Sequence, residues 1–249
     1  MNQIKYHKQS GFTLIELMLA MSFISLLLIA ITATTIQVSN VYNKGLTLRS
    51  VNQVGRELTA SLRRDINASQ SFNVSNPKDT KDGTRRYLVQ KANDNKTFGG
   101  RLCMGSVSYV WNYGETLTND KASDYNKYND NTKVRLARVI DNGAQLCFSP
   151  SSPVEKNMAT ELLISKDNLE LALHNFNITQ SDSTTITSQA LYTITLTIGT
   201  NEQDTITGLG NGSEECTPSS GGSENWEFCA INKFDIVARA ANSIGTGEN

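Results

Sequence analysis

Four cysteines and two histidines are the side chains of this sequence that could carry nucleophilic or metal chemistry. A cysteine–histidine nucleophile needs several groups to converge on one point, and nothing in the sequence near His174 supports such an arrangement. Zinc sites usually draw their ligands from close pairs such as C-x-x-C, whereas these cysteines are far apart: Cys103, Cys147, Cys216 and Cys229. No G-x-S-x-G or phosphate-loop pattern is present. We therefore expect no enzyme and no metal site at these residues.

The cysteines are better suited to disulfides. All four follow a long hydrophobic segment, so they lie on one side of the membrane if that segment crosses it. Outside the cytoplasm such thiols pair. A bond from Cys216 to Cys229 would close a short loop and stabilise the fold by about 3 kcal/mol. Four cysteines allow three pairings, and the sequence alone does not choose among them.

The hydrophobic segment follows a short basic leader. Lys5 and Lys8 lie in this leader, and no charged side chain occurs between Leu17 and Asn43. This length is sufficient for a helix to cross a bilayer, and it exceeds the apolar core of a secretory signal. Basic residues before the segment favour an N-terminus left in the cytoplasm.

Glu16 is the one carboxylate at the start of this segment. A carboxylate at the centre of a bilayer costs about 2 to 3 kcal/mol, so its presence there indicates a function or a partner. Cleavage between Gly11 and Phe12 would create a cationic amine four residues before Glu16. In a filament of staggered helices, the amine of one subunit would then pair with Glu16 of the next.

The run Ser10 to Leu17, S-G-F-T-L-I-E-L, resembles the class III signal of type IV prepilins and pseudopilins. In that family a membrane-embedded prepilin peptidase cuts after the glycine and methylates the new terminal residue. The resemblance, which covers about the first 30 residues, implies cleavage after Gly11, methylation of Phe12 and a role in assembly for Glu16. The alternative is a plain signal anchor with a glutamate near the membrane surface.

Calcium binding is suggested only by this resemblance, because some similar pseudopilins bind calcium near the C-terminus. Asp204, Glu214 and Glu215 offer oxygen ligands in a C-terminal loop. They lack the regular acidic spacing of an EF-hand, so we expect solvated loop acids and no cofactor, with calcium as the alternative.

The helical pattern continues beyond the apolar segment. Apolar residues recur every three or four positions from Leu48 to Ile66, as on one face of a helix. A helix over 12–66 would be about 80 Å long, more than twice the bilayer core, so its second half must pack on soluble structure. We interpret Gly45 and Gly55 as tolerated within this helix, and the charges from Arg56 to Asp65 as a solvated face.

The rest of the chain is predicted to be β-structure. A turn-rich run over 67–83 ends the helix. Residues 141–143, Asp-Asn-Gly, predict a hairpin turn. Alternation or enrichment in β-branched and aromatic residues predicts strands at 87–90, 102–111, 134–140, 145–148, 162–165, 169–178, 191–198 and 234–238. Short turns between them favour an antiparallel sheet, on which the apolar stripe of the helix would pack.

These features predict an α+β, type IV pilin-like fold: a long N-terminal helix with a transmembrane and an amphipathic half, an antiparallel sheet and a C-terminal loop bounded by a disulfide. The expected divisions are a leader at 1–11, a transmembrane and assembly helix at 12–38, its amphipathic continuation at 39–67 and an extracytoplasmic β-rich domain at 68–249. The C-terminal loop between paired cysteines also resembles the disulfide-bounded region of many pilins.

The function expected from the resemblance is structural. The chain would be a pilus subunit, and its size among pilins suggests a minor pilin. Its partners would be other pilin subunits, prepilin peptidase, the assembly platform in the inner membrane and cytoplasmic membrane lipid. It would reside in the cytoplasmic membrane as a single-pass protein and later at the cell surface. The formal net charge of −1 gives no reason to expect nucleic acid.

Three alternatives stay open. The chain could belong to a type II secretion pseudopilus, or it could be a membrane-tethered binding module that forms no filament. A third alternative is DNA uptake through a competence pilus, in which exposed basic residues such as Arg85 and Arg86 would bind DNA.

Overall fold

The computed structural model describes residues 11–72, 74, 86–91, 97–117, 126–129, 133–149, 152–164, 169–181, 190–201, 205–208, 212–217 and 228–240. The chain divides into two compact units, Met1–Asn43 and Lys44–Asn249. Of the predicted leader at 1–11, residues 1–10 lie outside the described residues. So do Arg85, Asp204 and most of the loop that precedes Cys229.

The first element is the helix α1, Leu14–Ala68, which confirms the predicted long helix. In the second unit its residues alternate between an exposed and a buried face. The buried face enters the main hydrophobic core, which also contains residues of both large sheets. Its apolar members recur every three or four residues: Val51, Val54, Leu58, Leu62 and Ile66.

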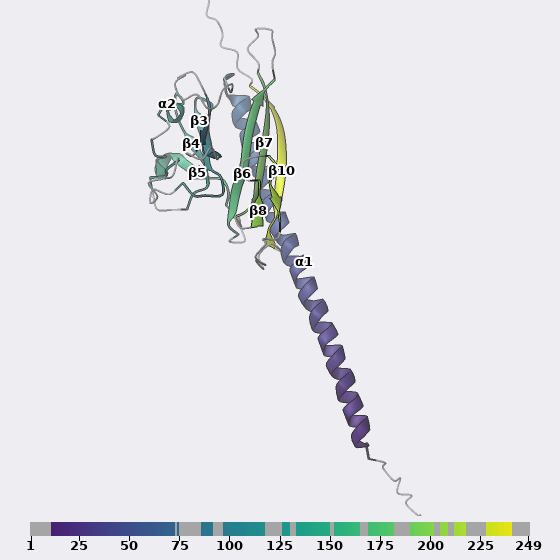
Figure 1. The fold of residues 1–249 in the computed structure, drawn as a ribbon. Helices are drawn as coiled ribbons and strands as arrows, with labels where there is room; N and C mark the ends of the chain where they lie inside the picture. Colours follow the sequence, from purple (N-terminus) through teal and green to yellow (C-terminus); the bar gives the residue numbers. More distant parts are fainter. Residues whose placement is uncertain are drawn as a thin grey trace, which may run out of the picture. The chain divides into compact units, whose positions relative to one another are not determined.

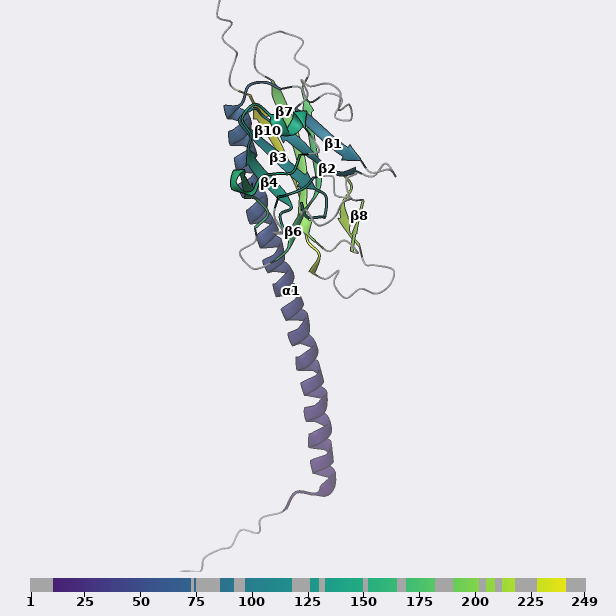
Figure 2. The same ribbon diagram turned by 90° about the vertical axis from the view of Figure 1, so that its left-hand side faces the viewer.

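A five-stranded antiparallel sheet has the strand order β1-β2-β3-β4-β5. Figure 1 shows it as a layer separate from the other large sheet, and Figure 2 shows β1 to β4 side by side. Both of its faces carry buried apolar side chains, with Trp111 in the main core and Val110 in a second core. Its strands are β1 Tyr87–Lys91, β2 Thr97–Cys103, β3 Val107–Asn112, β4 Leu136–Ile140 and β5 Ala159–Glu161.

The second sheet has three antiparallel strands in the order β10-β7-β6. Its strands are β6 Leu171–Gln180, β7 Leu191–Thr200 and β10 Ile231–Arg239. A small pair, β8 Ile206–Thr207 and β9 Glu215–Cys216, lies between β7 and β10 in the chain. The disulfide Cys216–Cys229 joins β9 to the segment that precedes β10. The α+β fold class with a C-terminal disulfide-bounded loop is thus confirmed, although the described strands form two large sheets and one small pair where a single sheet was predicted.

Aromatic side chains join the two sheets. The ring of Trp111 on β3 stacks on that of Phe176 on β6, with centroids 4.2 Å apart. A register shift in β6 between Leu173 and Asn175 precedes this contact. The hydroxyls of Tyr87 and Tyr113 donate to the carbonyl of Phe176, each at 3.0 Å. Side chains of the first sheet therefore satisfy the backbone at the edge of the second.

The strand predicted at 145–148 is wrong, because these residues form the short helix α2, Gln145–Phe148. The hairpin predicted at 141–143 is wrong for the same reason, since its turn leads into α2. The carboxylate of Asp141 accepts the backbone N–H groups of Gln145 and Leu146, at 2.8 and 3.1 Å. Such a bond satisfies donors that a helix leaves free at its N-terminus, and it favours a helix over a strand.

Two further contacts hold α2 against the five-stranded sheet. The disulfide Cys103–Cys147 ties the helix to β2. Arg101, fully buried on β2, donates to the carbonyls of Leu146 and Ser152, both at 2.9 Å. Burial lowers the pKa of the Arg101 guanidinium to about 10. The cation replaces lost hydration with carbonyl oxygens.

Two more strand predictions need correction. The strand predicted at 102–111 is two, because Gly105 at φ 101° turns the chain between β2 and β3. The strand predicted at 162–165 is wrong. The pairing with β4 ends at Glu161, and of the following described residues only Ile164 forms an isolated bridge, to Glu170.

The predictions for two residues of α1, Gly55 and Asp65, need correction. A Cβ at Gly55 would collide with the ring of Phe234 on β10, so this glycine permits a close approach, whereas Gly45 has open space around it. Asp65 is not solvated as predicted, since its carboxylate pairs with the guanidinium of Arg138 on β4. The amphipathic half of α1 is therefore fitted to both sheets.

Candidate functional site

The N-terminus of α1 is closed by a reciprocal pair, Thr13 and Glu16. The hydroxyl of Thr13 accepts the backbone N–H of Glu16 at 3.3 Å. The Glu16 carboxylate in turn accepts the backbone N–H and the hydroxyl of Thr13, both at 3.3 Å. This is a capping box, the S/T-x-x-E pattern that satisfies free donors in the first helical turn. Glu16 is thus exposed yet already bonded within its own chain.

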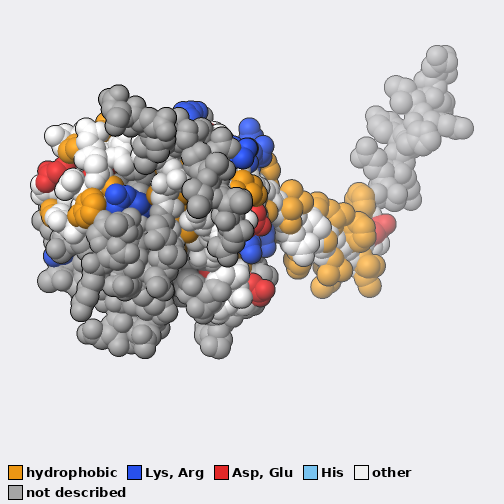
Figure 3. All heavy atoms as spheres, turned by 90° about the horizontal axis from the view of Figure 1, so that it is seen from above, with side chains coloured by type: hydrophobic (Ala, Val, Ile, Leu, Met, Phe, Trp, Pro, Cys, Tyr) orange, Lys and Arg blue, Asp and Glu red, His pale blue; other side chains and the backbone are white. Residues whose placement is uncertain are grey.

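The helix that follows is apolar on all sides. Figure 3 shows hydrophobic side chains along the visible face of this segment. Phe12 is 86% exposed, and large apolar residues remain exposed through Leu48. Among the described residues one helix, α1, is long and apolar enough to cross a membrane. Its position near the N-terminus is consistent with membrane anchoring.

Hydroxyl groups in this segment bond to the helix itself. Ser22 and Ser25 donate to the carbonyls four residues earlier, at 2.9 and 2.8 Å. Thr32 and Thr35 do the same, both at 2.8 Å. A hydroxyl satisfied by its own backbone costs less in hydrocarbon than a free one. The polar residues of the segment are therefore compatible with lipid or with a packed helix bundle.

The described side chains of the globular unit that could carry chemistry do not converge. The four cysteines form the disulfides Cys103–Cys147 and Cys216–Cys229, which leaves no thiolate for a metal or a nucleophile. His174 is fully buried, with Nε2 2.9 Å from the carbonyl oxygen of Thr200. Burial lowers the pKa of this imidazole to about 4. Among the described residues, no three His, Cys, Asp or Glu side chains could hold a metal together.

The acidic C-terminal loop is described in part. Glu214 accepts the hydroxyl of Thr197 at 3.0 Å and the backbone N–H of Gly212 at 2.9 Å. Glu215 lies on β9. Because Asp204 lies outside the described residues, the expectation of solvated loop acids, with calcium as the alternative, stays a prediction.

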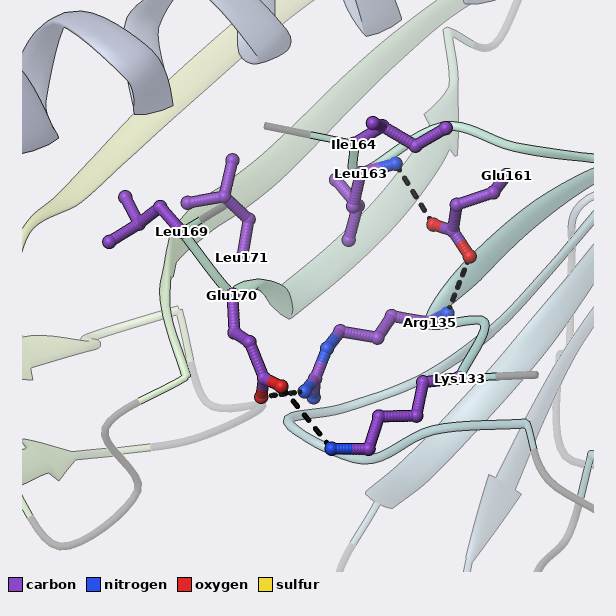
Figure 4. A pocket seen from close by; sticks show the side chains of 8 residues that line it. All are labelled: Lys133, Arg135, Glu161, Leu163, Ile164, Leu169, Glu170 and Leu171. Carbon is purple, nitrogen blue, oxygen red and sulfur yellow. Dashed lines mark hydrogen bonds and ion pairs between the residues drawn. The ribbon is translucent and has the colours of Figure 1, made fainter. Parts of the chain in front are cut away.

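A pocket of about 220 Å³ opens beside β5 and the start of β6 (Figure 4). Each of its charged side chains is hydrogen-bonded or ion-paired. Glu170 bonds Arg135 at 2.6 Å and Lys133 at 3.3 Å. Glu161 accepts the backbone N–H groups of Arg135 and Leu163, both at 2.9 Å, and burial raises the pKa of its carboxyl. These contacts explain the local backbone conformation.

Comparison with known proteins identifies the N-terminal segment. Residues 6–34 match the family described as the prokaryotic N-terminal methylation motif. No curated protein and no solved structure matches the chain. The resemblance seen at Ser10 to Leu17 is therefore confirmed: the chain carries a type IV prepilin-like class III signal. In general terms, this motif supports a type IV pilin-like or pseudopilin-like subunit.

The structure adds one residue to the site that was not predicted from the sequence. Thr13 caps the helix together with Glu16, although Glu16 alone was singled out. The pattern T-L-I-E before an apolar run is a sequence signature of a capping box and could have revealed it.

Proposed function

We propose that this chain is a structural subunit, a minor pilin, of a type IV pilus or a related filament. The observation that carries the proposal is the methylation motif at 6–34, followed by a capped and wholly exposed apolar helix. An apolar helix without partners must be covered by lipid or by other helices. Prepilin peptidase would cut after Gly11 and methylate Phe12, and Glu16 would pair with the amine of a neighbouring subunit.

The proposed divisions follow the expected ones: leader 1–11, membrane and assembly helix 12–38, amphipathic helix 39–67 and extracytoplasmic domain 68–249. Before assembly the protein would be held in the cytoplasmic membrane, with its two disulfides outside the cytoplasm. It would then pass through an assembly platform into the filament. The minor role is supported by size, since 249 − 11 leaves 238 residues in the mature chain.

The test is N-terminal peptide and intact-mass analysis of the protein from its native cells. We expect a chain that begins at Phe12 and carries one additional methyl group. A Gly11→Leu variant should remain uncut, while a Gly45→Ala variant should be processed normally. A wild-type chain that begins at Met1 would contradict the proposal and leave a membrane-tethered module.

A further inference from the structure

The exposed side of α1 carries arginines at a fixed interval. Arg49, Arg56 and Arg63 are exposed and lie seven residues apart. Seven residues make nearly two helical turns, so each arginine lies about 10.5 Å along the axis from the previous one and is rotated by about 20°. The three guanidinium groups therefore follow one line, here called the arginine stripe.

The arginine stripe faces away from the core. The buried side of the same helix, which includes Val54 and Leu58, packs against the sheets. At 100° per residue, Arg56 is rotated by about 160° from both. Gln53 and Ala60, which have shorter side chains, separate the arginines along the exposed side. A straight rod such as another helix would fit along this line.

The charge of the stripe is not neutralised within the described residues. Arg49 and Arg63 have no ion pair there, and Arg56 donates to the backbone carbonyl of Asn52. Glu57 is the one acid between Arg49 and Arg64, and it accepts a hydrogen bond from Gln53. Four arginines, including Arg64, and one glutamate leave a net charge of +3 on this surface. The whole chain has a formal net charge of −1.

We propose that the arginine stripe binds an acidic helix of a different pilin-like subunit. Helices packed side by side repeat their contacts every seven residues, and carboxylates at that spacing would meet the arginines one by one. A second copy of this chain that met the stripe with its own stripe would place arginines opposite arginines, which is unfavourable, and the one acid in the same stretch of its helix is Glu57. The stripe would thus exclude self-association and select a different neighbour. This inference rests on the proposed filament function.

Site-directed crosslinking of the full chain in its native cells tests this inference. An Ala60→Cys variant places a thiol within the stripe, and a Val237→Cys variant places one on the exposed face of β10 as a control. The described cysteines are all in disulfides, so a maleimide–benzophenone reagent would attach to the introduced thiol and, on illumination, form a bond to a C–H group of the chain that lies beside it. We expect Ala60→Cys to give a product with a different mature subunit, joined through a helix that carries acids at seven-residue spacing.

Charge reversal is the decisive comparison. The triple variant R49E/R56E/R63E removes three exposed ion pairs, each worth about a twofold change in binding, and replaces them with repulsion. It should therefore reduce the crosslinked product at least about tenfold. Reversal of the partner's acids to lysine should restore it. The matched variant K233E/R239E, which reverses exposed charges on β10, should leave the yield unchanged.

Several outcomes would overturn the inference. These are a product that joins two copies of this chain, a yield unaffected by R49E/R56E/R63E, or no protein product. If the last outcome accompanies weaker flotation of R49E/R56E/R63E with phosphatidylglycerol vesicles, the stripe faces lipid. If any of these results is obtained with a chain that begins at Phe12 and is found in filaments, only this inference is refuted. An uncut chain defeats the proposed function as well.

Discussion

The carboxylate of Asp65 on α1 accepts two hydrogen bonds from the guanidinium of Arg138 on β4, at 2.7 Å from Nε and 3.0 Å from Nη2. The hydroxyl of Tyr109 donates to the same carboxylate at 2.7 Å. The Asp65 side chain is 10% exposed and that of Arg138 is 30% exposed. This hydrogen-bonded pairing raises the pKa of Arg138. It fixes the end of α1 on the five-stranded sheet.

Replacing Asp65 by asparagine should destabilise the globular unit by about 2 kcal/mol. The substitution keeps the shape but leaves a partly buried guanidinium without its counter-charge. Denaturant unfolding of the full chain in neutral micelles measures the loss. Glu57→Gln, an exposed change on the same helix, should alter stability by less than about 0.5 kcal/mol. Equal effects of the two substitutions would show that the Asp65 pair contributes nothing specific.

The two helical glycines should respond in opposite directions to alanine. Gly45→Ala should stabilise the helix by about 0.8 kcal/mol, because alanine is the better helix former and nothing lies near its Cβ. Gly55→Ala should destabilise the protein by about 1 to 3 kcal/mol, because its methyl group meets the ring of Phe234. Unfolding in denaturant compares the two variants directly.

A second substitution separates packing from propensity at Gly55. Phe234→Leu should by itself cost stability, yet it should reduce the penalty of Gly55→Ala because the smaller side chain yields space. A double-mutant cycle measures this coupling. Simple additivity of the two changes would mean that the contact between Gly55 and Phe234 does not limit the approach of α1 to β10.

Local patterns were sufficient to predict the helix and most strands. The spacing of Val51, Val54 and Leu58 reports a buried face without knowledge of its partner. The alternation at 191–198 likewise predicts β7. These signals lie within a few consecutive residues, and tertiary contacts agreed with them. The N-terminal methylation motif was recognisable for the same reason, since it is contiguous.

The errors arose where distant residues decide the structure. The segment 145–148 has a strand-like composition, but the disulfide to Cys103 and the guanidinium of Arg101 hold it against β2 as a helix, which the nearby Asp141 caps. The partner of Asp65 lies 73 positions away. No local pattern predicts such a pair. Alternation also cannot tell which strands are neighbours, so one sheet was expected where the described strands form two large sheets and a small pair.

His174 should make stability depend on pH between about 4 and 6.5. Its folded-state pKa of about 4 lies below the ordinary value of 6.5, so in this range the unfolded chain binds a proton that the folded chain does not. Stability is therefore highest above pH 6.5 and falls as the pH decreases toward 4. The expected loss from this group is about 3 kcal/mol.

A His174→Gln variant isolates this contribution, because glutamine does not titrate and can still donate to the carbonyl of Thr200. Glu161, whose pKa burial raises, acts in the opposite direction, and both proteins share its effect. Unfolding free energies at several pH values should show a shallower decline for His174→Gln than for the wild type. Parallel curves would mean that His174 is protonated equally in both states.

The capping box separates two roles of Glu16 that a single substitution would confuse. Thr13→Val removes the hydroxyl that pairs with Glu16 but keeps the carboxylate charge. Glu16→Gln removes the charge, while glutamine still serves in a capping box. We expect Thr13→Val to accelerate amide exchange in the first turn of α1 about fivefold, as the loss of a cap worth about 1 kcal/mol predicts. Glu16→Gln should leave that exchange nearly unchanged.

Filament incorporation should show the reverse order. If Glu16 pairs with the amine of a neighbouring subunit, Glu16→Gln should lose incorporation strongly, whereas Thr13→Val should retain most of it. Immunoblots of sheared filaments, normalised to processed protein in the membrane, measure both variants. Equal incorporation of Glu16→Gln and wild type would mean that Glu16 serves its own helix. The partner that its position in an apolar segment calls for would then be the hydroxyl and backbone of Thr13.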